Sequence, residues 1–150
     1  MEKTEFLYYG IFIDNNTRLK LNEYLSNIWR YDVALSFAEK QYIHHCTVLH
    51  KTAASYKKDV LSFCESHLGE KFSGKITAVG ESGEAMAFRV EFPDVPFAGK
   101  IPHITIATFS GGKPVDSNYI EEWEDLEEPV EIIGTLGVCT PDGILFGEVD

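Results

Sequence analysis

Two short segments of the sequence carry the same arrangement of potentially catalytic residues. His45-Cys46-Thr47-Val48 and His103-Ile104-Thr105-Ile106 each place a histidine two positions before a threonine and an apolar residue directly after it. Because side chains at positions i and i+2 of a β-strand project from the same face, each histidine is expected to stand beside its own threonine. Together the two segments offer two imidazoles and two hydroxyls.

This set of groups suits chemistry at a phosphodiester. A neutral histidine can take a proton from an attacking water or hydroxyl, and a protonated histidine can give one to the leaving oxygen. Threonine hydroxyls can hold the non-bridging oxygens without repelling them. Since the reference pKa of histidine is about 6.5, either histidine can serve as acid or base near neutral pH, and the rate profile should be bell-shaped. The sequence thus predicts four catalytic residues, called the motif residues below: His45, Thr47, His103 and Thr105.

Both motifs fall in β-like runs of an alternating order of strands and helices. Runs rich in β-branched and aromatic residues predict strands at 6–13, 43–49, 72–79, 85–92, 101–108, 130–138 and 144–149. Near-helical apolar spacing predicts helices at 17–29 and 55–67, and a short helix capped by Asp116 or Ser117 that runs to Trp123. This order indicates an α+β fold with an antiparallel or mixed sheet and outer helices. A chain of 150 residues suits a single domain over 1–150.

The same pattern predicts how the first helix begins and packs, and where the turns and loops lie. Thr17 or Asn16 is expected to cap the first helix, and its apolar stripe is expected to pack on the sheet. That stripe consists of Leu19, Leu21, Leu25, Ile28 and Trp29. The turn at 81–84 predicts a hairpin, the Pro- and Gly-containing segment 93–100 predicts a loop, and the acidic run 121–128 is interpreted as a solvated edge.

The charge and cysteine content limit the partners and the setting. The net charge is −11, from 24 acidic and 13 basic residues, which weighs against duplex nucleic acid because such binding depends on Lys and Arg. Cys46, Cys64 and Cys139 are odd in number and widely spaced, so no disulfide framework or zinc ribbon is indicated. No run approaches the roughly 20 apolar residues of a membrane span, and nothing in residues 1–5 resembles a targeting segment. A small substrate and a cytoplasmic location are therefore expected, while the oligomeric state is not indicated.

The paired motifs resemble those of the 2H phosphoesterase superfamily, also called LigT-like. Within it the sequence is most similar to the cyclic phosphodiesterase domain of plant-type tRNA ligases. The likeness is carried by HCTVLHK (45–51), PHITIATF (102–109) and GGKPVDSNYIEEW (111–123). A more distant likeness is to phage 2H enzymes that degrade cyclic oligonucleotide signals of bacterial immunity (the anti-CBASS type).

The resemblance implies a bilobal, pseudo-symmetric fold with a central cleft and a hydrolase that needs no cofactor and no metal. It implies opening of a 2′,3′-cyclic phosphate or cleavage of a small phosphodiester, with the four motif residues at the centre. The expected partner is a small or cyclic nucleotide or an RNA terminus. The alternatives are the phage-type activity on cyclic oligonucleotides and a catalytically idle module that only binds a nucleotide.

Four further residues are candidates for substrate binding. Tyr8 and Tyr9 lie on the first predicted strand and project to opposite faces, so one of them could stack on a base while the other packs in the core. Lys113 follows two glycines and could pair with a phosphate, or could lie in a solvated loop. Ser117 could add a hydrogen bond to the substrate, although capping of a helix is the commoner role.

A metal site is the main alternative for the first motif. His44, His45 and His50 are close in sequence, and imidazole is a usual zinc ligand. Strand alternation sends His45 to one face and the other two histidines to the opposite face, so the three cannot converge unless a bulge intervenes. Cys46 is also expected to face away from the cleft, which argues against a cysteine nucleophile. The simplest structural alternative is that His45 and His103 are half-buried strand residues whose nitrogens are satisfied locally.

Overall fold

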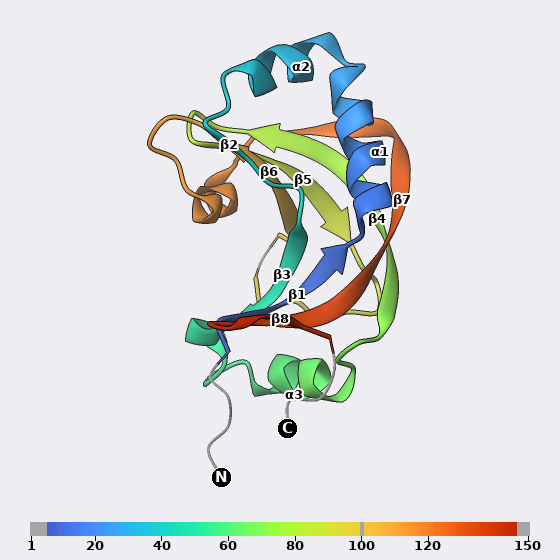
Figure 1. The fold of residues 1–150 in the computed structure, drawn as a ribbon, viewed down its shortest axis with the longest axis vertical. Coiled ribbons are helices and arrows are strands. Elements are labelled where there is room, and N and C mark those ends of the chain that lie inside the picture. The colour runs from blue at the N-terminus through green and yellow to red at the C-terminus, as the bar shows by residue number, and fades with distance from the viewer. Residues whose placement is uncertain (1–5, 100, 147–150) are drawn as a thin grey trace.

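Six antiparallel strands form a closed barrel (Figure 1) in the computed structural model, which describes residues 6–99 and 101–146. In order around the barrel they are β1 (Tyr8–Ile13), β3 (His45–His50), β6 (His103–Thr108), β5 (Ala85–Glu91), β4 (Lys71–Glu81) and β7 (Trp123–Thr140). The ring closes because β1 pairs with both β3 and β7. Two short strands are added, β2 (Lys40–Gln41) on β6 and β8 (Gly143–Leu145) on β7. The prediction of an α+β fold is confirmed, and every strand pair described is antiparallel.

The helices lie at the two ends of the barrel (Figure 1). At one end lie α1 (Asn15–Ser26) and α2 (Trp29–Ser36), and at the other lies α3 (Lys58–Ser66). Two 3-10 turns, η1 (Lys51–Ala53) and η2 (Pro114–Tyr119), follow the two motif strands. Asp14 caps α1 by accepting from the Thr17 amide at 2.7 Å, so the expected caps, Asn16 and Thr17, lie inside the helix instead. No helix within the described residues is both long enough and apolar enough to cross a membrane.

The core is formed by the apolar alternate residues of the strands together with the inner faces of the helices. Ile11 of β1 and Ile104 and Ile106 of β6 are fully buried. Leu21 and Leu25 of α1 are also fully buried, as the helical spacing predicts. Since each CH₂ removed from water is worth about 0.8 kcal/mol, these aliphatic side chains are a major source of stability.

Two segments differ from the sequence-based expectation. Residues 30–42, which show little pattern, contain all of α2 except its first residue, Trp29. Trp29 has 79% of its surface exposed and does not belong to the apolar stripe of α1. The acidic run 121–128 is solvated as expected, yet from Trp123 onward it is part of the long strand β7 rather than an edge after a short helix. Residues 147–149 of the predicted last strand, Lys100 of the predicted loop and residues 1–5 lie outside the described residues.

Register shifts interrupt four of the described strand pairs, β1 with β3, β4 with β5, β4 with β7 and β5 with β6, and two of these bulges lie beside cavities. Between β4 and β7 the register passes from Ile76 with Val130 to Ala78 with Asp125, which leaves residues 126–129, including Pro129, outside the ladder. Between β1 and β3 the register passes from Tyr9 with Leu49 to Gly10 with Thr47, so Val48 is the extra residue. The second bulge reverses the side-chain alternation of β3 directly after the first motif.

Candidate functional site

The two motifs meet where β3 lies beside β6. These strands are in register at one residue pair, Cys46 with Ile104, which are the central residues of the two motifs. In an antiparallel pair, the neighbours of a registered pair oppose one another crosswise. Each motif histidine is therefore beside the threonine of the other motif, and all four side chains project from the face opposite the buried Cys46 and Ile104.

His45 is held on three sides. Its Nε2 lies 3.1 Å from Thr47 Oγ1, and its Nδ1 lies 3.0 Å from Nδ1 of His44. The ring of Tyr8 stacks on the imidazole with centroids 4.6 Å apart and planes 18° apart. When His45 donates its Nδ1 proton to His44, its Nε2 is the basic nitrogen beside the Thr47 hydroxyl.

His103 and Thr105 have different partners. Nδ1 of His103 donates to the backbone carbonyl of Ile101 at 2.9 Å, so the neutral ring presents an unprotonated Nε2. Thr105 Oγ1 lies 3.0 Å from Oγ of Ser117, which is buried in η2. The turn that follows the second motif therefore fixes the hydroxyl of that motif.

Burial makes the charged form of both motif histidines costly. Burial, together with the nearby His44 and His103, lowers the pKa of His45 to about 3. Burial also lowers the pKa of His103, although the hydrogen bond to the Ile101 carbonyl acts in the opposite direction. The pKa of His44 is lowered by burial and by Arg18. All three rings are therefore neutral in the unliganded protein at neutral pH.

The four motif residues line one cavity of about 650 Å³. Its walls come from β1, β3 and β6, from residues 97–99 and 101–102, and from η1 and η2. The other lining residues are Tyr8, Val48, His50, Thr52, Ala53, Tyr56, Phe97, Ala98, Gly99, Ile101, Pro102, Pro114, Val115 and Asn118. None of the described lining residues is an Asp, Glu, Lys or Arg, so the described part of the lining offers neutral donors and histidines to an anionic ligand.

The four residues predicted to bind substrate occupy different places. Tyr8 lines the cavity, whereas Tyr9 is buried in the core against Phe6, where burial and nearby Glu65 raise its pKa to about 12. Lys113 is exposed and does not line the cavity; its amide donates to Asp116 Oδ2 at 2.8 Å. Ser117 reaches the site only through its bond to Thr105.

Two histidines that alternation sends to the opposite face lie at the site instead. His44 contacts His45 because the chain turns sharply at Ile43, whose φ of 54° is unusual for a β-branched residue. His50 lines the same cavity as His45 because Val48 is bulged. The expectation that His44 and His50 face away from the site is therefore wrong. No sequence signal locates the bulge, which depends on how β3 fits against β1.

The described residues around the site offer neither a reactive cysteine nor a metal site. Cys46 is fully buried and burial raises the pKa of its thiol, so it offers no thiolate. Within residues 6–99 and 101–146, no group of three or more His, Cys, Asp or Glu is arranged to hold a metal ion.

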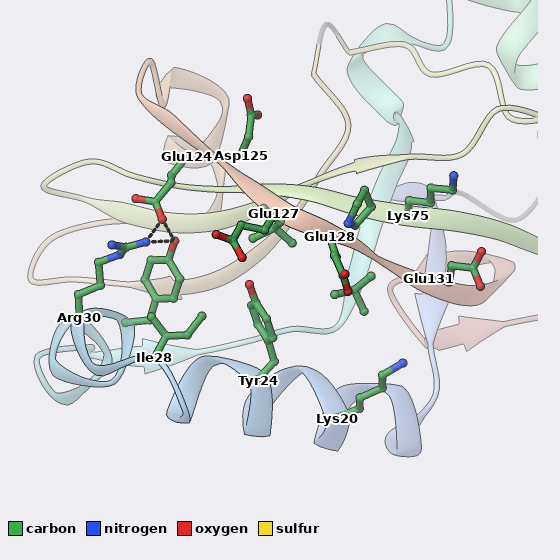
Figure 2. Close-up of a pocket in the computed structure, with 14 residues that line it drawn as sticks. Lys20, Tyr24, Ile28, Arg30, Lys75, Glu124, Asp125, Glu127, Glu128 and Glu131 are labelled. Atoms are coloured by element: carbon green, nitrogen blue, oxygen red, sulfur yellow. Dashed lines mark hydrogen bonds and ion pairs between the residues drawn. The ribbon is translucent and has the colours of Figure 1, made fainter.

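A second cavity, of about 890 Å³, lies between α1, α2 and the bulged part of β7 (Figure 2). Carboxylates gather along its β7 side, and Glu124 is bound there by Arg30 and by the Tyr31 hydroxyl. The cavity is lined by no histidine, cysteine, serine or threonine among the described residues. It therefore lacks the histidine and threonine side chains that meet in the first cavity.

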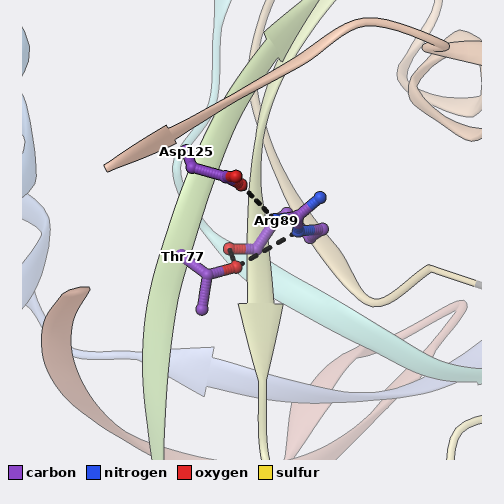
Figure 3. A network of polar contacts seen from close by, with 3 residues as sticks. All are labelled: Thr77, Arg89 and Asp125. Carbon is purple, nitrogen blue, oxygen red and sulfur yellow. Dashed lines mark hydrogen bonds and ion pairs between the residues drawn. The ribbon is translucent and has the colours of Figure 1, made fainter. Parts of the chain in front are cut away.

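The strand next to the second motif is tied to the barrel by Arg89. This residue is in register with His103, and Figure 3 shows its side chain between Thr77 and Asp125. Its Nε donates to Thr77 Oγ1 at 3.2 Å and its Nη2 pairs with Asp125 Oδ1 at 2.6 Å. The guanidinium thus connects β5, β4 and β7 beside the site.

Comparison with known proteins identifies a similar fold. No protein-family model matches the chain, and no curated protein matches it significantly. A solved structure described as a fungal RNA kinase superimposes with a TM-score of 0.66 and 14% sequence identity, over 91% of this chain and 45% of that one. The chain thus spans less than half the length of that protein. At this identity the likeness shows a shared fold.

Proposed function

We propose that the chain is a metal-independent phosphodiesterase of the 2H type that hydrolyses a small or cyclic nucleotide or an RNA 2′,3′-cyclic phosphate end. The observation that carries the proposal is the crosswise meeting of the two His-x-Thr motifs at one registered pair of β3 and β6, inside one cavity. A local two-fold relation of this kind is in keeping with the pseudo-symmetric, bilobal fold of the family that the motifs resemble. The fold shared with an RNA kinase is compatible with a nucleotide ligand.

The hydrolysis uses two proton transfers. A water molecule attacks phosphorus and gives its proton to one histidine, while the P–O bond to the leaving oxygen breaks and that oxygen takes a proton from the other histidine. Thr47 and Thr105 donate to the non-bridging oxygens, on which charge builds up in the transition state. Ser117 holds Thr105 in place, and Tyr8 holds the ring of His45.

The partners of the two histidines favour one assignment of roles. The Ile101 carbonyl stabilises the doubly protonated form of His103, which suits a general acid. His45 is kept neutral by burial and by its neighbours, and His44 can accept its Nδ1 proton, which suits a general base. An anionic substrate raises both pKa values when it binds, and the ring already bonded to a carbonyl is the better placed to take up the proton.

The proposal is tested with purified protein and a panel of 2′,3′-cyclic mononucleotides, RNA ending in a cyclic phosphate, and cyclic di- and trinucleotides. His45→Ala and His103→Ala are each expected to lower turnover by at least about 100-fold while the protein keeps its fold. His67→Ala is a matched control, because His67 lies at the end of α3 and pairs with Glu70. Full activity in either motif variant would contradict the proposal. Tight binding with recovery of intact ligand would indicate a binding module instead.

A further inference from the structure

The cavity extends well beyond the motif residues. On β1, Phe12 is in register with His45 and Tyr8 with His50. Four residues of a strand span about 13 Å, so His50 marks an end of the cavity distant from His45. That distal end is lined by His50, Thr52, Ala53 and Tyr56, and the Tyr8 ring leans from its position opposite His50 toward His45.

The distal end contains a third histidine and threonine separated by one residue. His50 Nδ1 accepts from the Thr52 amide at 3.3 Å and lies 3.1 Å from Thr52 Oγ1. An amide can only donate, so Nδ1 of the neutral ring is unprotonated and the proton is on Nε2. Within the described part of the chain Nε2 has no partner, which leaves a donor available to a ligand in the cavity.

The distal end also offers a flat surface. Tyr56 is 71% exposed although it lines the cavity, and an exposed tyrosine ring can stack on a nucleobase. A scissile phosphate bound between the two motifs would occupy only the proximal end. A single nucleotide with its phosphate at that position leaves the His50 donor unused.

From these observations we infer that the distal end is a subsite for a second nucleotide, whose phosphate accepts from His50 Nε2 and whose base stacks on Tyr56. The inference rests on the proposed function and narrows it: the preferred substrate has at least two nucleotides, with a second phosphate beyond the one that reacts. The role of His50 in capping η1 uses Nδ1 alone, so capping and phosphate binding are compatible.

The test compares a 2′,3′-cyclic mononucleotide with a dinucleotide that ends in the same cyclic phosphate. His50→Asn is the informative variant, because the Asn side-chain oxygen can still accept from the Thr52 amide. Its NH2 group then takes the place of Cδ2, so the donor at the position of Nε2 is lost. In this variant, and in Tyr56→Ala, kcat/KM for the dinucleotide is expected to fall about tenfold while that for the mononucleotide changes less than about twofold. An equal fall for both substrates, or no change for either, would overturn the subsite.

Binding measurements separate this inference from the proposed function. In His45→Ala, the dinucleotide is expected to bind about tenfold more tightly than the mononucleotide, and the double variant with His50→Asn is expected to lose that preference. If the native protein hydrolyses neither compound but the preference is present, the proposed function fails and the subsite is supported. If both are hydrolysed without any preference, the proposed function is supported and the subsite is refuted.

Discussion

The four motif side chains form two chemically similar pairs whose partners differ. His45 is bound to His44 and to its own threonine, whereas His103 is bound to the Ile101 carbonyl and its threonine to Ser117. Because these partners shift the two protonation equilibria differently, the acid and the base can be assigned by experiment.

The first prediction uses substrates with different leaving groups. An aryl phosphodiester with a good leaving group needs no general acid, so His103→Ala should regain activity on it, approaching the native rate to within about tenfold. His45→Ala should stay impaired on every substrate, because activation of the attacking water is still required. The measurement is kcat over a series of leaving groups of decreasing pKa. Equal recovery of both variants would show that the roles are not divided in this way.

The second prediction concerns acid stability. The pKa of His45 is lowered by folding to about 3, so the unfolded chain binds a proton that the native chain does not between about pH 6.5 and pH 3. The stability associated with neutral His45 is complete above about pH 6.5 and is lost as the pH falls through this window. At about pH 5 the loss is about 2 kcal/mol.

His45→Gln removes this titration. Its free energy of unfolding, measured with denaturant, should fall less between about pH 7 and pH 5 than that of the native protein, by about 2 kcal/mol. His44 and His103 remain in the variant and titrate in both proteins. An identical pH dependence in the two proteins would contradict the lowered pKa of His45.

The elements that carry the motifs show what local patterns predict and where they fail. The strands at 43–49 and 101–108 were predictable because the motifs alternate with apolar residues, and β3 and β6 confirm them. The places of His44 and His50 were not predictable, because they depend on the strained turn at Ile43 and on the bulge at Val48. Both features arise from the fit between distant segments, which periodicity does not report.

Two further elements, α2 and the first half of β7, were not predictable from the sequence pattern, for different reasons. The helix α2 begins with the exposed Trp29, is followed by the exposed Phe37 and has one buried residue, Tyr31, so it shows no apolar stripe of the usual kind. The first half of β7 is rich in acidic residues, which are rare in strands, so the sequence does not predict a strand there. Pairing with β4 holds the first half of β7 as a strand although its residues are solvated.

The third prediction concerns the loop between β6 and η2. A Cβ on Gly112 would overlap the backbone carbonyl of Glu84, so the loop would have to move. Gly112→Ala should lower stability by about 1–3 kcal/mol and also lower kcat, because displacement of η2 shifts Ser117 from Thr105. Thermal unfolding and steady-state kinetics measure the two effects. Gly83→Ala, where a Cβ has open space, should leave both unchanged.

At the scale of the whole molecule, the strongly negative net charge contrasts with the uncharged described lining of the cavity. The chain has a net charge of −11, yet no charged residue is among the described lining of the cavity. The overall field would therefore repel an anionic substrate over a long range, while the described lining of the cavity offers it neutral donors. The class of fold and the four motif residues follow from the sequence, but closure of the strands into a barrel does not, because it depends on pairing between β1 and β7, which are far apart in the chain.

The fourth prediction follows from this field. As the ionic strength rises from about 10 mM to about 150 mM, the Debye length falls from about 30 Å to about 8 Å, and repulsion of the substrate is screened. The value of kcat/KM for an anionic dinucleotide should therefore rise severalfold. A protein that neutralises phosphates with Lys and Arg shows the opposite dependence. A steep fall with salt would indicate a basic track leading to the site.

The single registered pair between β3 and β6 has a consequence for motion. Elsewhere in the barrel, neighbouring strands such as β4 and β7 are in register over long stretches. The pair of Cys46 and Ile104 is supported beside it by backbone bonds from Tyr42 and Ile43 to β6, so we expect this junction to open locally more readily than the pairing of β4 with β7. Backbone amides of β3 and β6 beside this junction should exchange their hydrogens with solvent faster than those of β4 and β7. A nucleotide bound to both motifs would connect the two strands. It should therefore slow that exchange, because its contacts would stabilise the junction that the short strand pairing leaves weak.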